Sequence, residues 1–310
     1  MGCAENSLLK EEHVKIHPSA IISEEAQVAS DVEIGPFCIV EPGVVIGAGC
    51  RLHPRVSIKT GVRMGENNHI YEGAVLGGIP QHTQLSGEIG GVIIGSGNTF
   101  RENATVHCAM YPDKFTRVGD NNFLMVNSHI AHDCVVGNYT IMANNVMLAG
   151  HVHVEDRAFL SGGVAVHQFC RVGMYAMLGG TAVAVQDVPP FVTVDGGTSM
   201  VVGLNSIGLR RAAVPSAEIR KIREAYDVLY SSVRPWEKIL FELRERFPDG
   251  MAAHFAEFLS DSTRGFLQER RKSGKSLKLV RPDEAVREVA EVAENIRVKT
   301  GTDDHTLKAV

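Results

Sequence analysis

Residues 16–51 read IHPSAI ISEEAQ VASDVE IGPFCI VEPGVV IGAGCR, six successive six-residue units that each open on an aliphatic side chain. Four more units follow to residue 75, and the register resumes at Ile94 and at Val118, from which it runs to Val183. A period of six does not fit an α-helix, but it suits a solenoid in which each unit is one short strand and a turn. Three units then form a triangular coil of eighteen residues.

The second and fifth positions of the units support this interpretation. The fifth position is small or β-branched with few exceptions, and four cysteines occupy it: Cys38, Cys50, Cys134 and Cys170. We expect these cysteines to fill small slots in the core as reduced thiols. Glycine is frequent at the second position, where a corner would need positive φ or a close approach of backbones.

Two segments break the six-residue register and are expected to project as loops, residues 79–91 and 109–117. After Val183 the repeats fade, and from Ser216 the sequence acquires helical periodicity in three segments, residues 216–233, 234–247 and 250–262. A basic connector leads to a last amphipathic segment, residues 282–299. These observations predict two domains, a β-solenoid over residues 1–196 and an α-helical domain with a connector and an extra tail over residues 197–310.

Composition excludes some classes of protein. No run of eighteen apolar residues exists, and the first residues lack the charged and apolar regions of a signal peptide. We therefore expect a cytoplasmic protein without a transmembrane segment. Acidic residues outnumber basic ones before residue 197, and the reverse holds after it.

Histidines gather in residues 127–138, NSHIAHDCVVGN. Residues eighteen apart should stack on successive coils about 4.8 Å apart, so Gly150 and Gln168 should follow His132 along one edge. His151 and His167 would then lie beside the same ridge. The loop at 109–117 should leave the same edge, and the loop at 79–91 would do so if it interrupts a single unit.

Three interpretations of these histidines compete. A lone histidine in a solenoid is ordinarily a corner residue without chemistry. A metal site needs three ligands around one point, and the His-x4-His spacing typical of γ-class carbonic anhydrases on such a fold is absent, so we expect no metal. A general base needs a partner that fixes its tautomer, which Asp133 could supply to His132.

Several motifs occur in a fixed order: HIAHDC (129–134), LAGH (148–151), VHQFC (166–170), VQDVPP (185–190), GLRR (208–211) and DSTRG (261–265). In this order they resemble the acyl-carrier-protein-dependent UDP-N-acetylglucosamine O-acyltransferases, which begin lipid A synthesis. The resemblance covers roughly residues 16–265. It implies an all-β left-handed parallel β-helix, a hexapeptide-repeat solenoid, followed by an α-helical C-terminal domain. This handedness is an exception to the right-handed rule for parallel crossovers.

The resemblance also implies roles for residues. His132 would deprotonate the sugar 3-hydroxyl, Asp133 would support the imidazole, and Gly150 would donate to the oxyanion. The implied substrate-binding residues are Gln81, His129, His151, His167, Gln168, Asn205 and Arg211. Gly180 matches the residue that ends the acyl-chain ruler, and a glycine there predicts a long 3-hydroxyacyl chain.

No cofactor is implied. The expected partners are acyl-carrier protein, UDP-N-acetylglucosamine and further copies of this chain in a homotrimer, with no nucleic acid. The carrier would meet a basic segment made of Arg210, Arg211, Arg220, Lys221 and Arg223.

Three departures from the family pattern bear on sugar specificity. The usual QDLKY loop reads QHTQL here, so His82 and Gln84 replace an acid and a lysine. Ile207 stands where a carboxylate is common, and the tail beyond Phe266 is longer than usual. Two alternatives therefore stay open: an N-acyltransferase that acts on an amino-sugar nucleotide, and a catalytically idle scaffold.

Overall fold

A computed structural model describes residues 15–230 and 234–270 of this chain. The described residues all belong to one compact unit, and the second unit of the chain, Arg271–Val310, lies wholly outside them. Nearly all of the connector and all of the predicted segment 282–299 fall in that second unit. Within the described residues no helix is long and apolar enough to cross a membrane.

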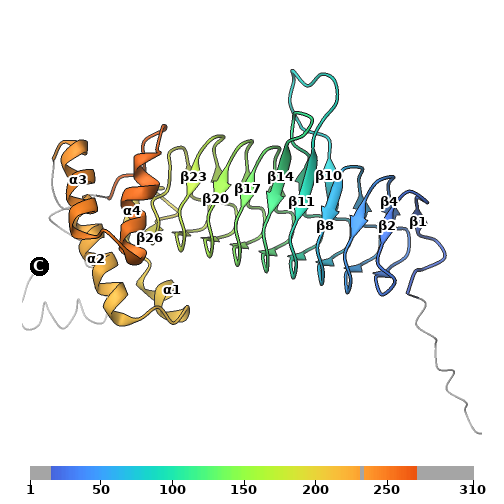
Figure 1. Cartoon of the computed structure of the whole chain (residues 1–310), viewed down its shortest axis with the longest axis horizontal. Coiled ribbons are helices and arrows are strands. Elements are labelled where there is room, and N and C mark those ends of the chain that lie inside the picture. The colour runs from blue at the N-terminus through green and yellow to red at the C-terminus, as the bar shows by residue number, and fades with distance from the viewer. Residues whose placement is uncertain (1–14, 231–233, 271–310) are drawn as a thin grey trace, which may run out of the picture. The chain divides into compact units, whose positions relative to one another are not determined.

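The strands form three sheets that the chain visits in turn, parallel throughout except for the last pair of sheet 3 (Figure 1). Sheet 1 contains β1 Ile21–Ile22, β4 Ile39–Val40, β7 Ser57–Ile58, β10 Val75–Gly78, β13 Thr105–His107, β16 His129–Ile130, β19 Met147–Leu148, β22 Ala165–Val166 and β25 Val183–Ala184. Sheet 2 contains β2 Gln27–Val28, β5 Val45–Ile46, β8 Val62–Met64, β11 Gly91–Ile94, β14 Phe115–Val118, β17 Val135–Val136, β20 His153–Val154 and β23 Arg171–Val172. Sheet 3 contains β3 Glu33–Ile34, β6 Arg51–Leu52, β9 His69–Ile70, β12 Thr99–Phe100, β15 Phe123–Leu124, β18 Ile141–Met142, β21 Phe159–Leu160, β24 Met177–Leu178, β26 Val192–Val194 and β27 Val201–Leu204.

Strand register confirms the coil of eighteen residues, since Ile21 pairs with Ile39 on the next coil. Val62 pairs with Val92, thirty positions later, because the first loop is inserted between β10 and β11. Val92 pairs with Thr116, twenty-four positions later, because the second loop is inserted between β13 and β14. Both predicted loops therefore project from the turns that join sheet 1 to sheet 2, and Figure 1 shows them side by side. The predicted loop bounds were too wide, since residue 91 belongs to β11 and residues 115–117 belong to β14.

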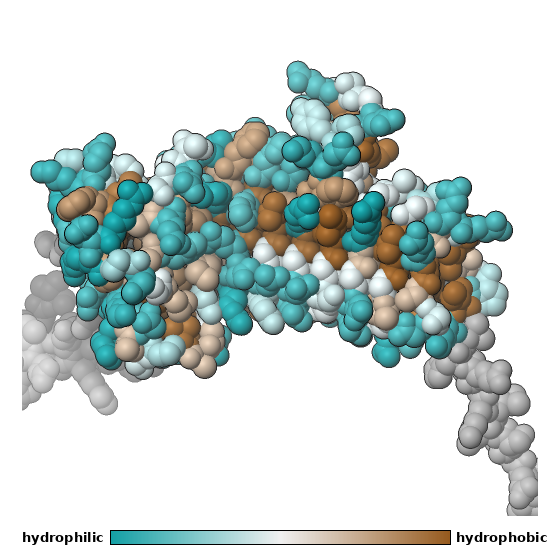
Figure 2. Space-filling view, in the orientation of Figure 1, coloured by the Kyte–Doolittle hydropathy of each residue, from teal (hydrophilic) through white to brown (hydrophobic). Residues whose placement is uncertain are grey.

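The core forms as the repeat predicts. In most strands the second residue is buried and the first faces outward. The four fifth-position cysteines are fully buried and free. Outward aliphatic residues remain partly exposed, and Figure 2 shows a hydrophobic band along the face that carries β8, β11 and β14.

A ladder of polar side chains interrupts this core at the fifth position, on the turns that join sheet 2 to sheet 3. Asn68 accepts a hydrogen bond from the Asn98 amide N–H at 2.9 Å, and Asn98 accepts one from Asn122 at 2.8 Å. Asn122 accepts both the amide N–H and the hydroxyl of Thr140, each at 2.7 Å. All four residues are buried, and the chain of bonds satisfies their polar groups.

The corners of the coil separate positive φ from close approach of backbones. Positive φ occurs at the fourth position of the units, as at Asn67 (φ 55) and Gly73 (φ 71). Second-position glycines have ordinary φ but no room for a side chain, since a Cβ at Gly47 would lie 2.6 Å from the Gly65 backbone. Of the two reasons predicted for second-position glycines, close approach of backbones is therefore the one that applies, and positive φ is not.

The C-terminal part contains α1 Ser206–Arg211, α2 Ser216–Tyr230, α3 Trp236–Arg246 and α4 Gly250–Ser260. The three later helices lie within the predicted segments, whereas the short α1 was not predicted. The predicted domain boundary at residues 196 and 197 falls inside the antiparallel pair of β26 and β27. That division into two domains stays a prediction.

Polar contacts tie α4 to the last coils. His254 Nε2 lies 2.7 Å from Glu155 Oε2, and His254 Nδ1 lies 3.1 Å from Glu257 Oε2. Arg171 pairs with Asp187 at 3.2 Å and donates to the carbonyl of Phe258.

Candidate active site

His132 lies in the turn between β16 and β17, on the edge where sheet 1 passes into sheet 2, hereafter the 1–2 edge. Its Nδ1 is 2.8 Å from Asp133 Oδ2, and the side chains are only 10% and 12% exposed. Because a carboxylate only accepts, Nδ1 carries the proton and the lone pair stands on Nε2. The structure therefore brings together the predicted base and its orienting acid.

The second loop fixes Asp133. The amide N–H of Met110, in the loop, donates to Asp133 Oδ2 at 3.2 Å. The amide N–H of Asp133 donates to the hydroxyl of buried Thr116 at 2.8 Å. Asp133 itself has positive φ (59), the conformation shared by the fourth position of the units. The backbone conformation, the bond that the Asp133 amide donates and the bond that its carboxylate accepts together hold the carboxylate against the imidazole.

Gly150 occupies the equivalent position on the next coil, as predicted. A Cβ on Gly150 would lie 2.6 Å from His132 Nε2 and 2.5 Å from Cε1, so a glycine is needed there while His132 holds its position. Among the described residues nothing accepts a hydrogen bond from the Gly150 amide. That N–H group stays available to a ligand beside the imidazole.

Two other histidine rings flank His132. His151 meets it edge to face with centroids 5.2 Å apart, stacks on Phe169, and places Nε2 3.8 Å from Asp133 Oδ2. Burial lowers the pKa of His151, which favours the neutral ring. His82, from the first loop, meets His132 edge to face at 5.9 Å.

His129 lies on the outer face of sheet 1, where its Nδ1 is 2.7 Å from the Thr105 hydroxyl. It packs edge to face on His107, with centroids 4.8 Å apart. Burial lowers the pKa of His129, and burial followed by the charges of His129 and His132 lowers the pKa of His107 to about 4. Sequence reasoning missed His107 and Thr105. Correcting the eighteen-residue step for the inserted loop would have placed Thr105 beside His129.

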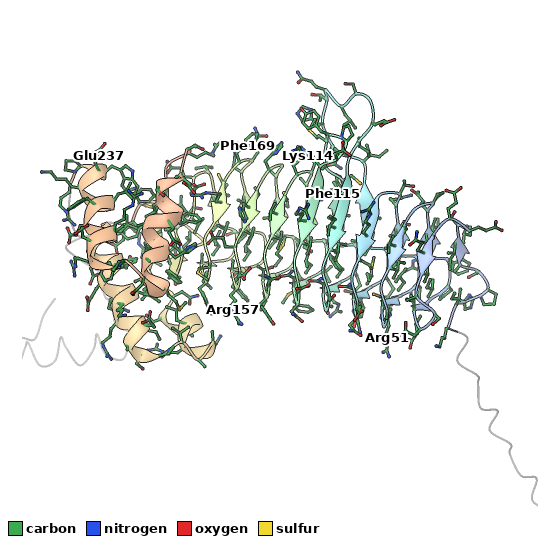
Figure 3. The ribbon with its side chains drawn as sticks, viewed as in Figure 1. Arg51, Lys114, Phe115, Arg157, Phe169 and Glu237 are labelled. Carbon is green, nitrogen blue, oxygen red and sulfur yellow. The ribbon has the colours of Figure 1, made fainter. Side chains whose placement is uncertain are left out.

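The remaining predicted residues of this edge are exposed. His167 and Gln168 lie one coil beyond Gly150, and His167 Nδ1 is 3.2 Å from the Gln168 carbonyl. Gln81 lies in the first loop next to His82 and is exposed. Figure 3 shows Phe169 on the same upper edge as Lys114 of the second loop.

Asn205 and Arg211 lie elsewhere, in a pocket of about 640 Å³ on the 2–3 edge, where sheet 2 passes into sheet 3. Asn205 caps α1, since its Oδ1 accepts the Gly208 amide N–H and its Nδ2 donates to the Tyr175 carbonyl, each at 2.9 Å. Within one chain the structure does not bring this pocket to His132.

Gly180 lies on the third edge, the 3–1 edge, where sheet 3 returns to sheet 1. A Cβ there would meet only the Gly162 carbonyl oxygen at 3.5 Å, so the position is open. Between Gly180 and the 1–2 edge, the outer face of sheet 1 presents Met147, 49% exposed, and Val183, 48% exposed.

His132, Asp133 and His151 are also the described residues that could hold a metal ion, since one ligand atom from each lies within 4.8 Å of the others. A tetrahedral zinc site separates neighbouring ligand atoms by roughly 3.3 Å. The 2.8 Å between His132 and Asp133 is instead a hydrogen-bond distance. The arrangement fits a base with its orienting acid better than a ligand set.

Comparison with known proteins shows which family has this sequence and fold. Residues 187–267 match the model for domain 2 of UDP-N-acetylglucosamine O-acyltransferase, and residues 43–78 and 115–150 match the bacterial transferase hexapeptide model. The chain is 43% identical to the acyl-[acyl-carrier-protein]–UDP-N-acetylglucosamine O-acyltransferase of Janthinobacterium sp. (strain Marseille) over 259 residues, covering 82% of this chain and 99% of the relative. It is 44% identical to that of Aliivibrio fischeri (strain MJ11) over 261 residues, covering 83% and 99%.

The solved structure of UDP-N-acetylglucosamine acyltransferase from Francisella novicida superposes with a TM-score of 0.80 at 36% identity, covering 85% of this chain and 99% of that one. The prediction of a left-handed β-helix followed by helices is confirmed. By its sequence, its fold and its near full-length match to these relatives, the chain belongs to the acyl-[acyl-carrier-protein]–UDP-N-acetylglucosamine O-acyltransferase family.

Proposed function

We propose that this protein transfers a 3-hydroxyacyl chain from acyl-carrier protein to the 3-hydroxyl of UDP-N-acetylglucosamine, the first step of lipid A synthesis. The observation that carries the proposal is His132, held by Asp133 at 2.8 Å beneath a glycine whose amide has no partner among the described residues. This is the arrangement that acyl transfer by general-base catalysis needs.

The reaction follows from that geometry. Nε2 of His132 takes the proton of the sugar hydroxyl as its oxygen attacks the thioester carbonyl carbon. The carbonyl oxygen becomes an oxyanion, and the Gly150 N–H donates to it. When the intermediate collapses, the carbon–sulfur bond breaks and the departing thiolate takes the proton from His132. Asp133 stabilises the imidazolium between these two proton transfers.

A homotrimer would complete the site. If three copies pack with their 3–1 edges toward a threefold axis, sheet 3 of one copy faces sheet 1 of the next. The 1–2 edge of one copy then meets the 2–3 edge of its neighbour. His132 and Tyr139 belong to one coil, so a pure rotation keeps them at the same height along the axis. The pocket at Asn205 and Arg211 would hold the nucleotide for the neighbour's His132.

The same packing gives the acyl chain a path. Met147, Ala165 and Val183 of sheet 1 would face apolar residues of a neighbour's sheet 3, such as Phe159, and Gly180 stands at the far end of this strip. Each methylene buried there contributes about 0.8 kcal/mol. His129, His151, His167, Gln168 and Gln81 lie where they could position the sugar or the thioester arm.

The acyl-carrier protein, an acidic helical partner, would dock on the exposed basic residues of α1 and α2: Arg210, Arg211, Arg220, Lys221 and Arg223. Lys221 is paired with Glu218 at 3.3 Å and Arg223 with the Ser206 hydroxyl at 2.9 Å, so Arg210 and Arg220 are the better candidates. We propose a cytoplasmic location for this reaction.

The test is a competition assay with 3-hydroxyacyl carriers of several lengths, UDP-N-acetylglucosamine and its 3-amino analogue. Transfer to the 3-hydroxyl supports the proposal. Acylation of the amino analogue alone would show that His82 and Gln84 have redirected sugar specificity, and no turnover with any donor would indicate an idle scaffold. Light scattering tests the trimer, since a stable monomer at micromolar concentration would contradict it.

A further inference from the structure

Three side chains form a stack along the 2–3 edge. Tyr139, Arg157 and Tyr175 occupy the fourth position on successive coils, each with φ between 55 and 58. The guanidinium carbon of Arg157 lies 4.5 Å from the ring centroid of Tyr139 and 5.9 Å from that of Tyr175. Arg157 is therefore held between two aromatic rings, and Figure 3 shows it on the lower edge of the solenoid, away from Phe169.

This stack forms one wall of the pocket that also contains Asn205 and Arg211. No Asp or Glu side chain from residues 15–230 or 234–270 lines the pocket. Neither Arg157 nor Arg211 forms a side-chain hydrogen bond or an ion pair with any residue the structure describes. Two permanent positive charges thus share a pocket without a counter-charge from those residues. Because a guanidinium stays ionised and presents several donors, the pocket favours a ligand with at least two negative charges.

Much of the remaining lining is apolar, with Ile141, Phe159, Met177 and Ile207 among it. An inorganic anion would leave this surface unused. A ligand that joins a planar base to a diphosphate would use both halves, since an aromatic platform accepts a base and the two arginines accept phosphate oxygens. The chemistry of the pocket is that of a nucleoside diphosphate.

We propose that Arg157, held between Tyr139 and Tyr175, is a second cationic contact for the diphosphate of the nucleotide sugar, acting together with Arg211. The inference rests on the proposed function and extends it, because it assigns phosphate recognition to the β-helix as well as to α1. It also gives a reason for the stack: the two rings hold the guanidinium by its faces, which leaves its N–H edges free.

The test is isothermal titration of the full chain with UDP and with uridine, neither of which requires an acyl donor. Arg157→Gln is expected to raise the Kd of UDP about tenfold, the effect of losing one hydrogen bond to a charged group. The Kd of uridine should change by less than about twofold. In turnover, the KM of the nucleotide sugar should rise with kcat unchanged, because the contact is the same in ground and transition states.

Arg157→Lys keeps the positive charge but loses the planar guanidinium with its paired N–H donors. It should give an intermediate loss of affinity for UDP, and that loss should grow with salt concentration. It also keeps the test decisive if Arg157→Gln does not fold, as judged by its melting curve. Arg63→Gln is the matched control, because Arg63 also lies over an aromatic ring, 5.9 Å from that of Phe115, and lines no part of this pocket. It should leave both affinities unchanged.

An unchanged Kd for UDP in the Arg157 variants overturns the inference, and so does an equal loss for UDP and uridine, which would make the stack a platform for the base alone. The two proposals fail separately. Arg157-dependent binding of UDP without acyl transfer would contradict the proposed function only. Normal transfer with Arg157-independent binding would contradict this inference only.

Discussion

Replacement of Gly150 by alanine tests the site most directly, because the structure shows which atoms the added methyl group would contact. Its Cβ would lie 2.5 Å from Cε1 and 2.6 Å from Nε2 of His132. Carbon contacts prefer about 3.5 Å or more, so the imidazole must retreat by about 1 Å. It cannot do so freely, because Asp133 holds Nδ1 and His151 packs against the ring.

A misplacement of about 1 Å can cost 10²-fold in rate. We therefore expect Gly150→Ala to lower kcat about 100-fold, or about 2.7 kcal/mol of barrier. The chain should still fold, since Gly150 has no positive φ and lies at an edge, although the strain at His132 should lower the melting temperature. The assay is the initial rate of transfer from a 3-hydroxyacyl carrier with both substrates saturating, beside a thermal melt.

Gly162→Ala is the control, because Gly162 has the same position in its unit on the 3–1 edge, where a Cβ meets only the Asn144 carbonyl oxygen at 3.5 Å. Gly162→Ala should transfer acyl chains at the same rate as the unmodified protein. If Gly150→Ala also retains activity within a few-fold, the base does not act from the position of His132, and the reasoning fails.

His132→Ala should lower kcat by 10² to 10⁴ while the fold is retained, as judged by a cooperative melting curve, and Asp133→Asn should cost less because the imidazole remains; activity of His132→Ala within a few-fold of the unmodified protein would refute its role as base. Gly180→Met should shift preference toward shorter acyl chains by tens-fold over a few carbons, measured by competition between carriers. Burial lowers the pKa of His254, but hydrogen bonds and charges from Glu155 and Glu257 outweigh it and raise the pKa above 6.5. The stabilisation of the folded state by protonated His254 is present below pH 6.5 and is lost as pH rises through the folded pKa. The melting temperature should therefore fall by a few degrees over this pH range, and His254→Gln should abolish this fall. If the melting temperatures of the variant and the unmodified protein follow parallel curves against pH, this prediction is contradicted.

The repeat predicted the fold well because the hexad period dictates which residues face inward and how coils stack. The same arithmetic placed Gly150 over His132 without any coordinates. It also predicted that the loop at 109–117 leaves the 1–2 edge, which the register confirms. For the loop at 79–91 the repeat left the edge open, because the interrupted eighteen residues could equally have been a whole coil, and only the strand pairing shows that it leaves the same edge.

The repeat could not predict features that do not follow its six-residue period. The contact of His82 with His132 depends on the path of a loop that has no period. The buried amides at Asn98 and Asn122 break the rule for the fifth position, and only hydrogen bonds between coils explain them. The pocket at Asn205 depends on α1, whose six residues are too few for a periodic signal.

The asparagine ladder carries an evolutionary consequence. Each rung accepts a hydrogen bond from the next coil, so replacing Asn98 alone by an aliphatic residue would leave the backbone N–H of Asn122 without its acceptor. It would also remove the side-chain donor to Asn68 Oδ1, which keeps only the bond from the backbone N–H of residue 98. A buried polar group without a partner costs about 1–3 kcal/mol. Substitutions at single rungs are therefore disfavoured intermediates, and the ladder positions should covary among homologues, exchanging together between an all-amide and an all-aliphatic column.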